Sequence, residues 1–283
     1  CTYCIIPYTR GRVRSRKIED IEAEAKRLAV GGYKEIVLTG IHLDSYGVDL
    51  ENENLLDVIR RIAAIDGIER IRLGSLEPRI MTEEFVEGLA SVKELCPHFH
   101  LSMQSGCDET LKRMNRKYDT EEFLACCDRL RAYFDEPALT TDVIVGFPGE
   151  TEEEFAEVCG FVEKMRFDKL GVFTYSPEEG TPAAEMDNQI DEEVKEERKN
   201  YIMEIQKRIS AEKCEEMIGK TIKVITDGKI PEEGVYCGRS YKDAPDIDGL
   251  VFFKADYEIM SGDFADVKIN ETSDYDLIGE AVY

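Results

Sequence analysis

The sequence predicts an α/β protein: a partial parallel (β/α) barrel, followed by a linker helix and a small antiparallel β-barrel. Two observations in the 283-residue chain predict this. Over residues 1–180, short β-prone apolar runs alternate with segments whose apolar residues recur every three or four positions, as in parallel βα units. After Pro182 comes one long charged helical stretch, and then short β-prone runs separated by Gly, Pro and Asp.

The barrel elements follow one another in a regular order. Apolar residues recur at helical spacing over 18–28, Gly31-Gly32 breaks the pattern, and residues 35–39 form a short β-prone run. The same alternation repeats along the chain, so residues 1–190 are expected to form the barrel core. The expected strands are 35–39, 68–73, 99–103, 139–145 and 170–175, and the expected helices are 18–28, 55–62, 82–89, 107–114, 120–134 and 152–165.

The pattern changes in the last third of the chain. Residues 191–216 are rich in charge with apolar positions at helical spacing, which predicts one long linker helix. Residues 217–283 contain only short β-prone runs and are expected to form a small β-barrel. Its expected strands are 221–226, 234–239, 249–253, 264–270 and 276–282.

Composition limits the function classes. The net charge of −24 disfavours nonspecific binding to polyanions. No run approaches the roughly 20 apolar residues of a membrane span, and no secretion signal opens the chain, so we expect a soluble, cytoplasmic protein with no membrane partner. Its nine cysteines are then expected to be reduced, which favours catalytic or metal roles over disulfides.

One basic run stands out against this acidity. Arg10, Arg12, Arg14, Arg16 and Lys17 occur with no carboxylate before the next glutamate. The four arginines are candidates for binding a substrate's phosphates. The alternative interpretation is a solvated strand edge.

Cys1 and Cys4 form a C-x-x-C pair, in which two intervening residues let both thiolates bind one metal centre. Three interpretations remain from the spacing: an iron–sulfur ligand pair, a zinc or redox pair, or no role. A zinc ribbon needs a second pair, which the scattered remaining cysteines do not supply. A thioredoxin-type redox motif opens a helix, which the following Ile5-Ile-Pro7 disfavours.

The residues around the pair resemble a known segment. Cys1-Thr-Tyr-Cys-Ile-Ile-Pro-Tyr-Thr-Arg-Gly11 is similar to the radical S-adenosylmethionine (SAM) segment of the MiaB/RimO/MtaB methylthiotransferases. That family writes C-x-x-x-C-x-x-C, so its first cysteine would lie four residues before Cys1. The family also has an N-terminal domain with three more cysteines. We therefore expect the core and C-terminal parts of a larger enzyme, inactive as this stretch alone.

The resemblance implies the cofactors and their contacts. Cys1 and Cys4 would bind a 4Fe–4S cluster that reduces SAM to a 5′-deoxyadenosyl radical, and a second 4Fe–4S cluster would sit in the N-terminal domain. A reducing donor such as flavodoxin or ferredoxin would supply the electron, and the enzyme is expected to be a monomer. Without the family, the segments that follow the strands are interpreted as connecting loops, turns and a helix N-cap. The SAM-contacting residues implied are Tyr3, Thr39, Gly40, Glu77, Gln104, Ile144, Gly146 and Gly149.

The sequence gives conflicting indications of the acceptor molecule, because two branches of the family match different parts of the chain. Residues 1–158 resemble the MtaB-type branch, which methylthiolates N6-threonylcarbamoyladenosine-37 of tRNA. Residues 159–283 resemble the RimO-type branch, which modifies an aspartate of a small-subunit ribosomal protein. We read the chain as a mosaic and expect tRNA, because the reacting pocket belongs to the first part.

The C-terminal segment raises the alternative acceptor. Residues 217–283 resemble a TRAM domain, usually an RNA-binding module, yet they carry seven basic and fourteen acidic residues. That balance suits a basic ribosomal protein better than tRNA. A non-catalytic fragment or an RNA- or protein-binding module is the alternative of a different class.

Overall fold

The structure is a computed structural model in which residues 1–232 and 234–282 are described. Five parallel strands form an open barrel, which confirms the predicted fold class. Strand β1 (Glu35–Leu38) pairs with β2 (Arg70–Leu73), and β4 (Ala138–Val145) lies between β3 (His98–His100) and β5 (Lys169–Thr174). Isolated parallel bridges join the two groups.

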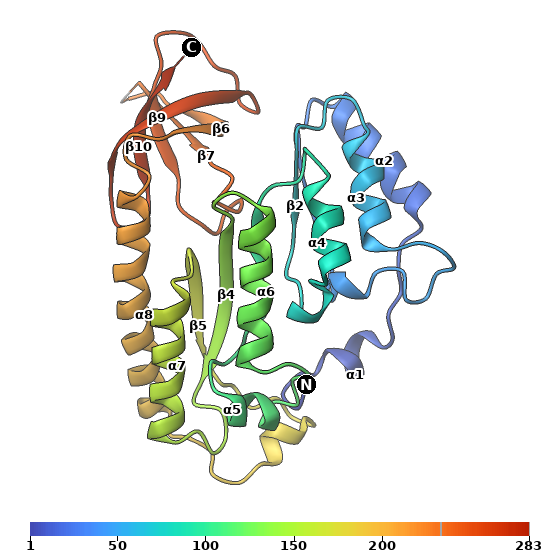
Figure 1. Cartoon of the computed structure of the whole chain (residues 1–283), viewed down its shortest axis with the longest axis vertical. Coiled ribbons are helices and arrows are strands. Elements are labelled where there is room, and N and C mark those ends of the chain that lie inside the picture. The colour runs from blue at the N-terminus through green and yellow to red at the C-terminus, as the bar shows by residue number, and fades with distance from the viewer. Residues whose placement is uncertain (233, 283) are drawn as a thin grey trace.

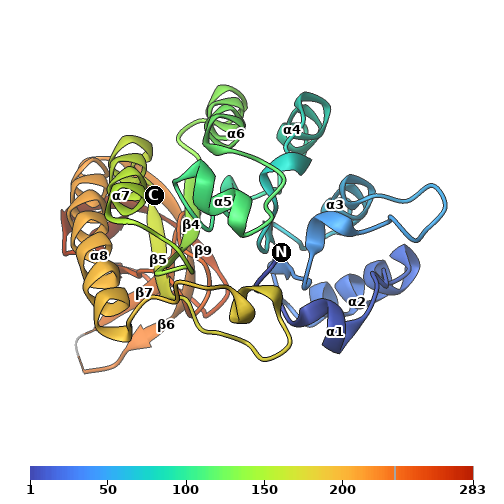
Figure 2. The same cartoon turned by 90° about the horizontal axis from the view of Figure 1, so that it is seen from below.

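Helices lie in an arc around the outside of these strands (Figures 1 and 2). They begin where the sequence signals a start: Asn54, Asp119 and Thr151 each close a capping box with the residue three positions on. Their apolar faces pack on the strands in one continuous core. The helices are α2 (Ile18–Val30), α3 (Leu55–Ala63), α4 (Glu83–Ala90), α6 (Thr120–Tyr133) and α7 (Glu152–Met165), with short turns at η1 (Leu43–Ser45), η2 (Pro78–Ile80) and η3 (Pro182–Glu185).

Two short helices lie near the N-terminus: α1 (Ile6–Arg10) and α5 (Asp108–Arg113). Helix α1 begins directly after the cysteine pair, contrary to the expectation that a proline there disfavours a helix. Pro7 lies in the first turn, where the missing N–H would have no helical partner anyway. Residues 11–17 form no strand, so the strand-edge interpretation of the basic run is wrong.

The long helix α8 (Glu192–Glu215) leads into a closed five-stranded barrel. Its strands are β6 (Thr221–Ile230), β7 (Val235–Arg239), β8 (Val251–Lys254), β9 (Phe264–Thr272) and β10 (Leu277–Val282). One expectation needs correction, because β8 and β10 pair in parallel. Strands cannot alternate in direction all the way round a closed ring with an odd number of members, so one pairing must be parallel.

The two barrels meet end to end. The small barrel lies over the amino ends of the parallel strands, whereas the N-terminus, α1 and α5 lie at their carboxyl ends (Figure 1). Among the described residues, no helix is both long and apolar enough to cross a membrane. The end left uncovered by the small barrel is the one where open α/β folds place their sites.

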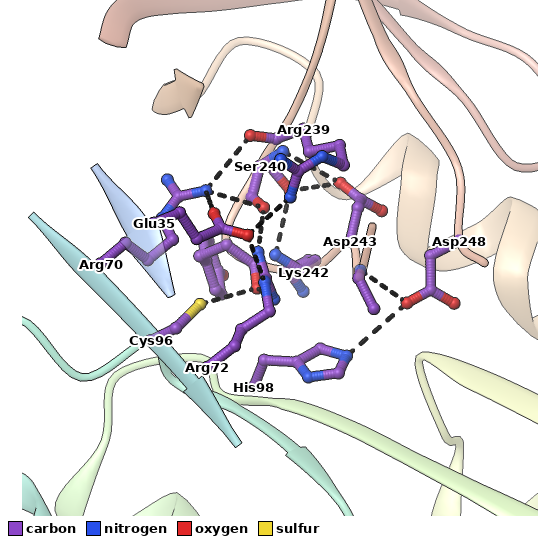
Figure 3. Close-up of polar contacts among 12 residues, drawn as sticks. Glu35, Arg70, Arg72, Cys96, His98, Arg239, Ser240, Lys242, Asp243 and Asp248 are labelled. Carbon is purple, nitrogen blue, oxygen red and sulfur yellow. Dashed lines mark hydrogen bonds and ion pairs between the residues drawn. The ribbon is translucent and has the colours of Figure 1, made fainter. Parts of the chain in front are cut away.

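A buried ion network joins the two barrels (Figure 3). The side chain of Glu35 is 6% exposed and contacts three arginines, with Oε1 2.7 Å from Arg239 Nη1 and 3.3 Å from Arg72 Nε. Arg70 Nη1 lies 3.2 Å from the other oxygen. Burial alone would raise the pKa of Glu35, but the arginines outweigh it and hold that pKa below its ordinary value.

The same arginines also bind the backbone of the small barrel. Arg70 and Arg72 both donate to the carbonyl of Ser240, and Arg72 donates to that of Tyr241 at 2.8 Å. Further along the interface, Asp168 pairs with Lys242 at 3.0 Å. The amino ends of the strands are thus closed by groups that satisfy buried charges rather than by apolar packing alone.

We predict that Glu35→Gln destabilises the protein strongly, because it removes the carboxylate that pairs with the buried Arg70 and Arg72, whereas Arg239 keeps its ion pair with Asp227. Losing one partner of a buried ion pair costs about 3–5 kcal/mol of unfolding free energy. Urea unfolding at neutral pH measures the loss, and Glu121→Gln, on an exposed position of α6, is the matched control.

The stabilisation by Glu35 should also depend on pH in a defined direction. A folded-state pKa below the ordinary value means that Glu35 stabilises the fold above the ordinary glutamate pKa of about 4.3 and loses that contribution as the pH falls through the lowered value. The difference between parent and Glu35→Gln should therefore shrink in acid. A difference that is small at neutral pH, or unchanged in acid, would contradict this account.

Candidate functional site

The cysteine loop is anchored on the last turn of α5. Thr2 donates its N–H to the Met114 carbonyl at 3.0 Å and its hydroxyl to the Arg113 carbonyl at 2.8 Å. Its own carbonyl accepts the Ala183 N–H at 2.9 Å. Carbonyls at a helix end lack helical partners, so the loop satisfies them. Cys1 is left exposed and Cys4 half-buried at the carboxyl end of the barrel.

Three predicted residues come together beside this loop. Tyr3 donates its hydroxyl to Gln104 Oε1 at 3.3 Å, and its ring packs edge-on against Phe147, with Ile144 in the same cluster. Burial raises the pKa of Tyr3 to about 12, although Arg116 opposes the shift, so the phenol stays a hydrogen-bond donor at neutral pH.

Gln104 reaches this position through an unusual backbone. Its φ is +69°, a left-handed conformation that non-glycine residues seldom adopt. Its N–H donates to the Asp142 carbonyl and its carbonyl accepts the Ile144 N–H, both at 2.9 Å. These bonds to β4 hold the backbone and leave the side chain to face Tyr3.

Glu77 lies in a second group of polar side chains, of which Arg116, His42 and Asp44 were not predicted from the sequence. Glu77 Oε1 is 3.8 Å from Arg116 Nη1, and the same nitrogen is 3.0 Å from Cys1 Sγ. His42, Asp44 and Glu77 offer polar atoms within 4.8 Å of one another. Arg116, His42 and Asp44 lie within residues 1–158, the part that resembles the MtaB-type branch, but nothing in their local spacing indicated that they would meet.

The remaining predicted contacts are placed differently. Thr39 and Gly40 are exposed in the loop after β1, and a Cβ on Gly40 would meet only Leu43 at an ordinary 3.6 Å. The fold itself therefore does not require glycine there. Gly146 and Gly149 bend the chain after β4: the Gly146 N–H donates to Glu150 Oε1 at 2.8 Å, and the Gly149 N–H to the Asn188 carbonyl at 2.9 Å.

The basic run is only partly free to bind a partner. Arg16 pairs with Glu24 and donates to a carbonyl of α2, so its charge is used within the fold. Arg10, Arg12 and Arg14 are exposed and have no ion pair among the described residues.

The donor set suits a thiophilic metal centre. The two cysteines lie on a loop that three hydrogen bonds hold in place, and Cys1 is exposed. Two such sulfurs fit an iron–sulfur cluster, and Tyr3 and Gln104 supply polar groups beside it. Cys1 and Cys4 provide two of the three thiolates that a cluster with one open iron needs. The residues present fit the group as part of its ligand set.

A partial parallel barrel with a C-x-x-C loop at its carboxyl end is the arrangement that the resemblance to enzymes binding SAM at an iron–sulfur cluster implied. Residues 1–162 match the family model described as the radical SAM superfamily, and residues 218–282 match the TRAM domain model. The chain belongs to the radical SAM superfamily and carries a C-terminal TRAM domain.

Curated relatives cover the whole chain. The ribosomal protein uS12 methylthiotransferase RimO of Lachnoclostridium phytofermentans is 45% identical over 99% of this chain and 64% of its own length. The tRNA-2-methylthio-N(6)-dimethylallyladenosine synthase of Thermoanaerobacter sp. strain X514 is 42% identical over 100% of this chain and 59% of its own length. The chain thus spans somewhat under two thirds of these relatives.

A solved structure supports the fold alone. The radical SAM methyltransferase TsrM from Kitasatospora setae superposes with a TM-score of 0.53 at 18% identity, over 65% of this chain and 36% of that one. At that identity, the likeness extends to the arrangement of strands and helices and not to the chemistry.

We predict that Gly146→Ala destabilises the protein more than Gly180→Ala. Both glycines have a positive φ, which costs alanine about 1–2 kcal/mol. A Cβ on Gly146 would also meet Lys195 Cγ at 2.3 Å, whereas one on Gly180 has nothing within 4 Å. Overpacking adds about 1–3 kcal/mol. Urea unfolding measures the free energy that each variant loses. Equal losses would contradict the prediction and show that the Lys195 side chain moves aside without destabilising the protein.

Proposed function

We propose that the chain is the catalytic barrel and TRAM domain of a radical SAM methylthiotransferase whose acceptor is a small-subunit ribosomal protein of the uS12 type. The observation that carries the reaction class is the anchored Cys1–Cys4 loop beside Tyr3 and Gln104, together with identity to methylthiotransferases along the whole chain. The second cluster of the family would lie in the part of the relatives that this chain does not span.

The residues of this chain have separable roles in that reaction. Cys1 and Cys4 would hold the cluster, which when bound supplies the electron that generates a radical from SAM. Tyr3 and Gln104 offer polar contacts for the SAM, with Ile144 in the apolar cluster on which Tyr3 packs. Phe147 and Tyr175, both buried, exclude water from this wall. An external low-potential donor, flavodoxin or ferredoxin, would supply the electron.

Charge and relatedness support the ribosomal protein as acceptor. Three relatives named as uS12 methylthiotransferases are 43–45% identical to this chain. The TRAM domain has twice as many acidic as basic residues, which favours a cationic protein over an RNA.

A specific observation keeps tRNA as the second candidate, which the sequence blocks of the first half had favoured. Arg10, Arg12 and Arg14 are exposed and unpaired among the described residues, in the segment that follows Cys4. Phosphates would be attracted there, whereas a cationic protein would be repelled. We prefer the ribosomal protein because the TRAM domain is acidic and three relatives are named as uS12 methylthiotransferases.

We predict that, in the full-length protein, Cys4→Ser abolishes the cluster held by Cys1 and Cys4, because it removes a ligand, and leaves the iron of the second cluster in place. Cys126→Ser is the matched control: this thiol is 2% exposed in α6, so its replacement should cost about 1 kcal/mol of stability and leave the iron in place. Iron content and visible absorbance after anaerobic reconstitution measure both. Iron loss in the Cys126 variant alone would reject the assignment.

The acceptor is tested by offering the full-length enzyme uS12 and tRNA together and following the methylthio product by mass spectrometry. We expect product on uS12, and less of it when residues 217–283 are exchanged for a basic TRAM domain, because the attraction to a cationic partner is then lost. Product on tRNA alone would replace the proposed acceptor. Salt sensitivity does not discriminate, since both partnerships are electrostatic.

A further inference from the structure

Arg116 is delivered to the cysteine loop by the end of α5. Asn115 adopts the left-handed conformation, with φ +58°, directly after the C-cap. The Arg116 N–H donates to the Leu111 carbonyl and the Asn115 N–H to the Lys112 carbonyl, both at 2.9 Å. This is the Schellman arrangement, which reverses the chain at a helix end. The same helix end anchors Thr2, so Arg116 and the cysteine loop share one support.

The guanidinium of Arg116 is held on every side. Its Nε donates to the Tyr118 hydroxyl at 2.8 Å and its Nη2 to the Ser102 carbonyl at 3.2 Å. The third nitrogen, Nη1, lies 3.0 Å from Cys1 Sγ and 3.8 Å from Glu77 Oε1. Two neutral oxygens therefore fix the plane of the group, and the remaining corner points at the sulfur.

The charge on this group is incompletely balanced. The Arg116 side chain is 8% exposed, and the carboxylate that pairs with it among residues 1–232 and 234–282, that of Glu77, is 3.8 Å away, beyond hydrogen-bond distance. A buried cation with so distant a counter-ion is costly unless another anion approaches it. The Cys1 sulfur is the group at that corner, and as a metal ligand it is a thiolate.

We propose that Arg116 is a positioning residue that holds the Cys1 sulfur and raises the reduction potential of the centre bound by Cys1 and Cys4. This rests on the proposed function. Reduction adds negative charge to an iron–sulfur centre, and a cationic N–H donor on a ligand sulfur stabilises the more negative state. The protein thus makes a low-potential centre easier for its electron donor to reduce.

The test is a potentiometric titration of the reconstituted full-length protein, followed by electron paramagnetic resonance. Three variants are compared with the parent: Arg116→Met removes the charge and the donor, Arg116→Lys keeps the charge, and Lys117→Met removes a cation from the adjacent exposed position. We expect Arg116→Met to lower the midpoint potential by at least a tenfold change in the reduction equilibrium, 59 mV for one electron. Lys117→Met should match the parent, with Arg116→Lys between.

Iron content and the melting temperature of the apoprotein complete the test. An unchanged potential in Arg116→Met would overturn the inference while leaving the proposed function intact. Iron loss in Arg116→Met with parental apoprotein melting would support a positioning role. Iron loss in both Arg116 variants with lowered melting would reduce Arg116 to a structural residue and overturn the inference. A parent that binds no cluster would overturn the proposed function as well.

Discussion

The buried carboxylate of Glu35 is the contact on which the arrangement of this molecule depends. Arg70 and Arg72 lie within the buried strand β2 and need anionic and carbonyl partners, because an unpaired charge in a protein interior is strongly destabilising. Glu35 supplies the anion, and the chain near Ser240 supplies the carbonyls. The TRAM domain is therefore fixed over the amino ends of the strands, and the carboxyl ends are left open for chemistry.

Helix α8 packs along the side of the parallel barrel and connects it to the TRAM domain. Its buried face is polar as well as apolar: Lys195 donates to the Tyr175 carbonyl, Gln206 to the Phe167 carbonyl, and Arg198 pairs with Glu150 at 2.7 Å. The helix thus packs along β5 as a wall of the barrel while it leads into the TRAM domain. Lys195 in its second turn restricts the bend at Gly146, and its last turn lies beside the small barrel.

Periodicity was enough to predict most strands and helices to within a few residues, because these elements have their own apolar faces. Helix α1 was missed, since it has no buried residue. Periodicity did not predict the contacts between distant segments. Arg70-Ile-Arg-Leu73 has the alternation of a half-exposed strand, yet all four residues are buried, since the partners of the arginines lie some 170 positions further on. The position of Arg116 beside Cys1 was not predicted for a similar reason. It depends on the left-handed conformation of Asn115, which the sequence pattern does not indicate.

The two ends of the molecule differ in charge, and distance keeps their effects separate. Strand β4 has eight residues, so its first and last residues are about 23 Å apart at a rise of about 3.3 Å per residue. At physiological salt the Debye length is about 8 Å, so the acidic TRAM domain exerts almost no field on a group at Cys1. It can select an acceptor only by touching it. Recognition by this domain therefore requires an acceptor large enough to contact both ends of the barrel, whereas a short segment bound at the cysteine loop would not reach the TRAM domain.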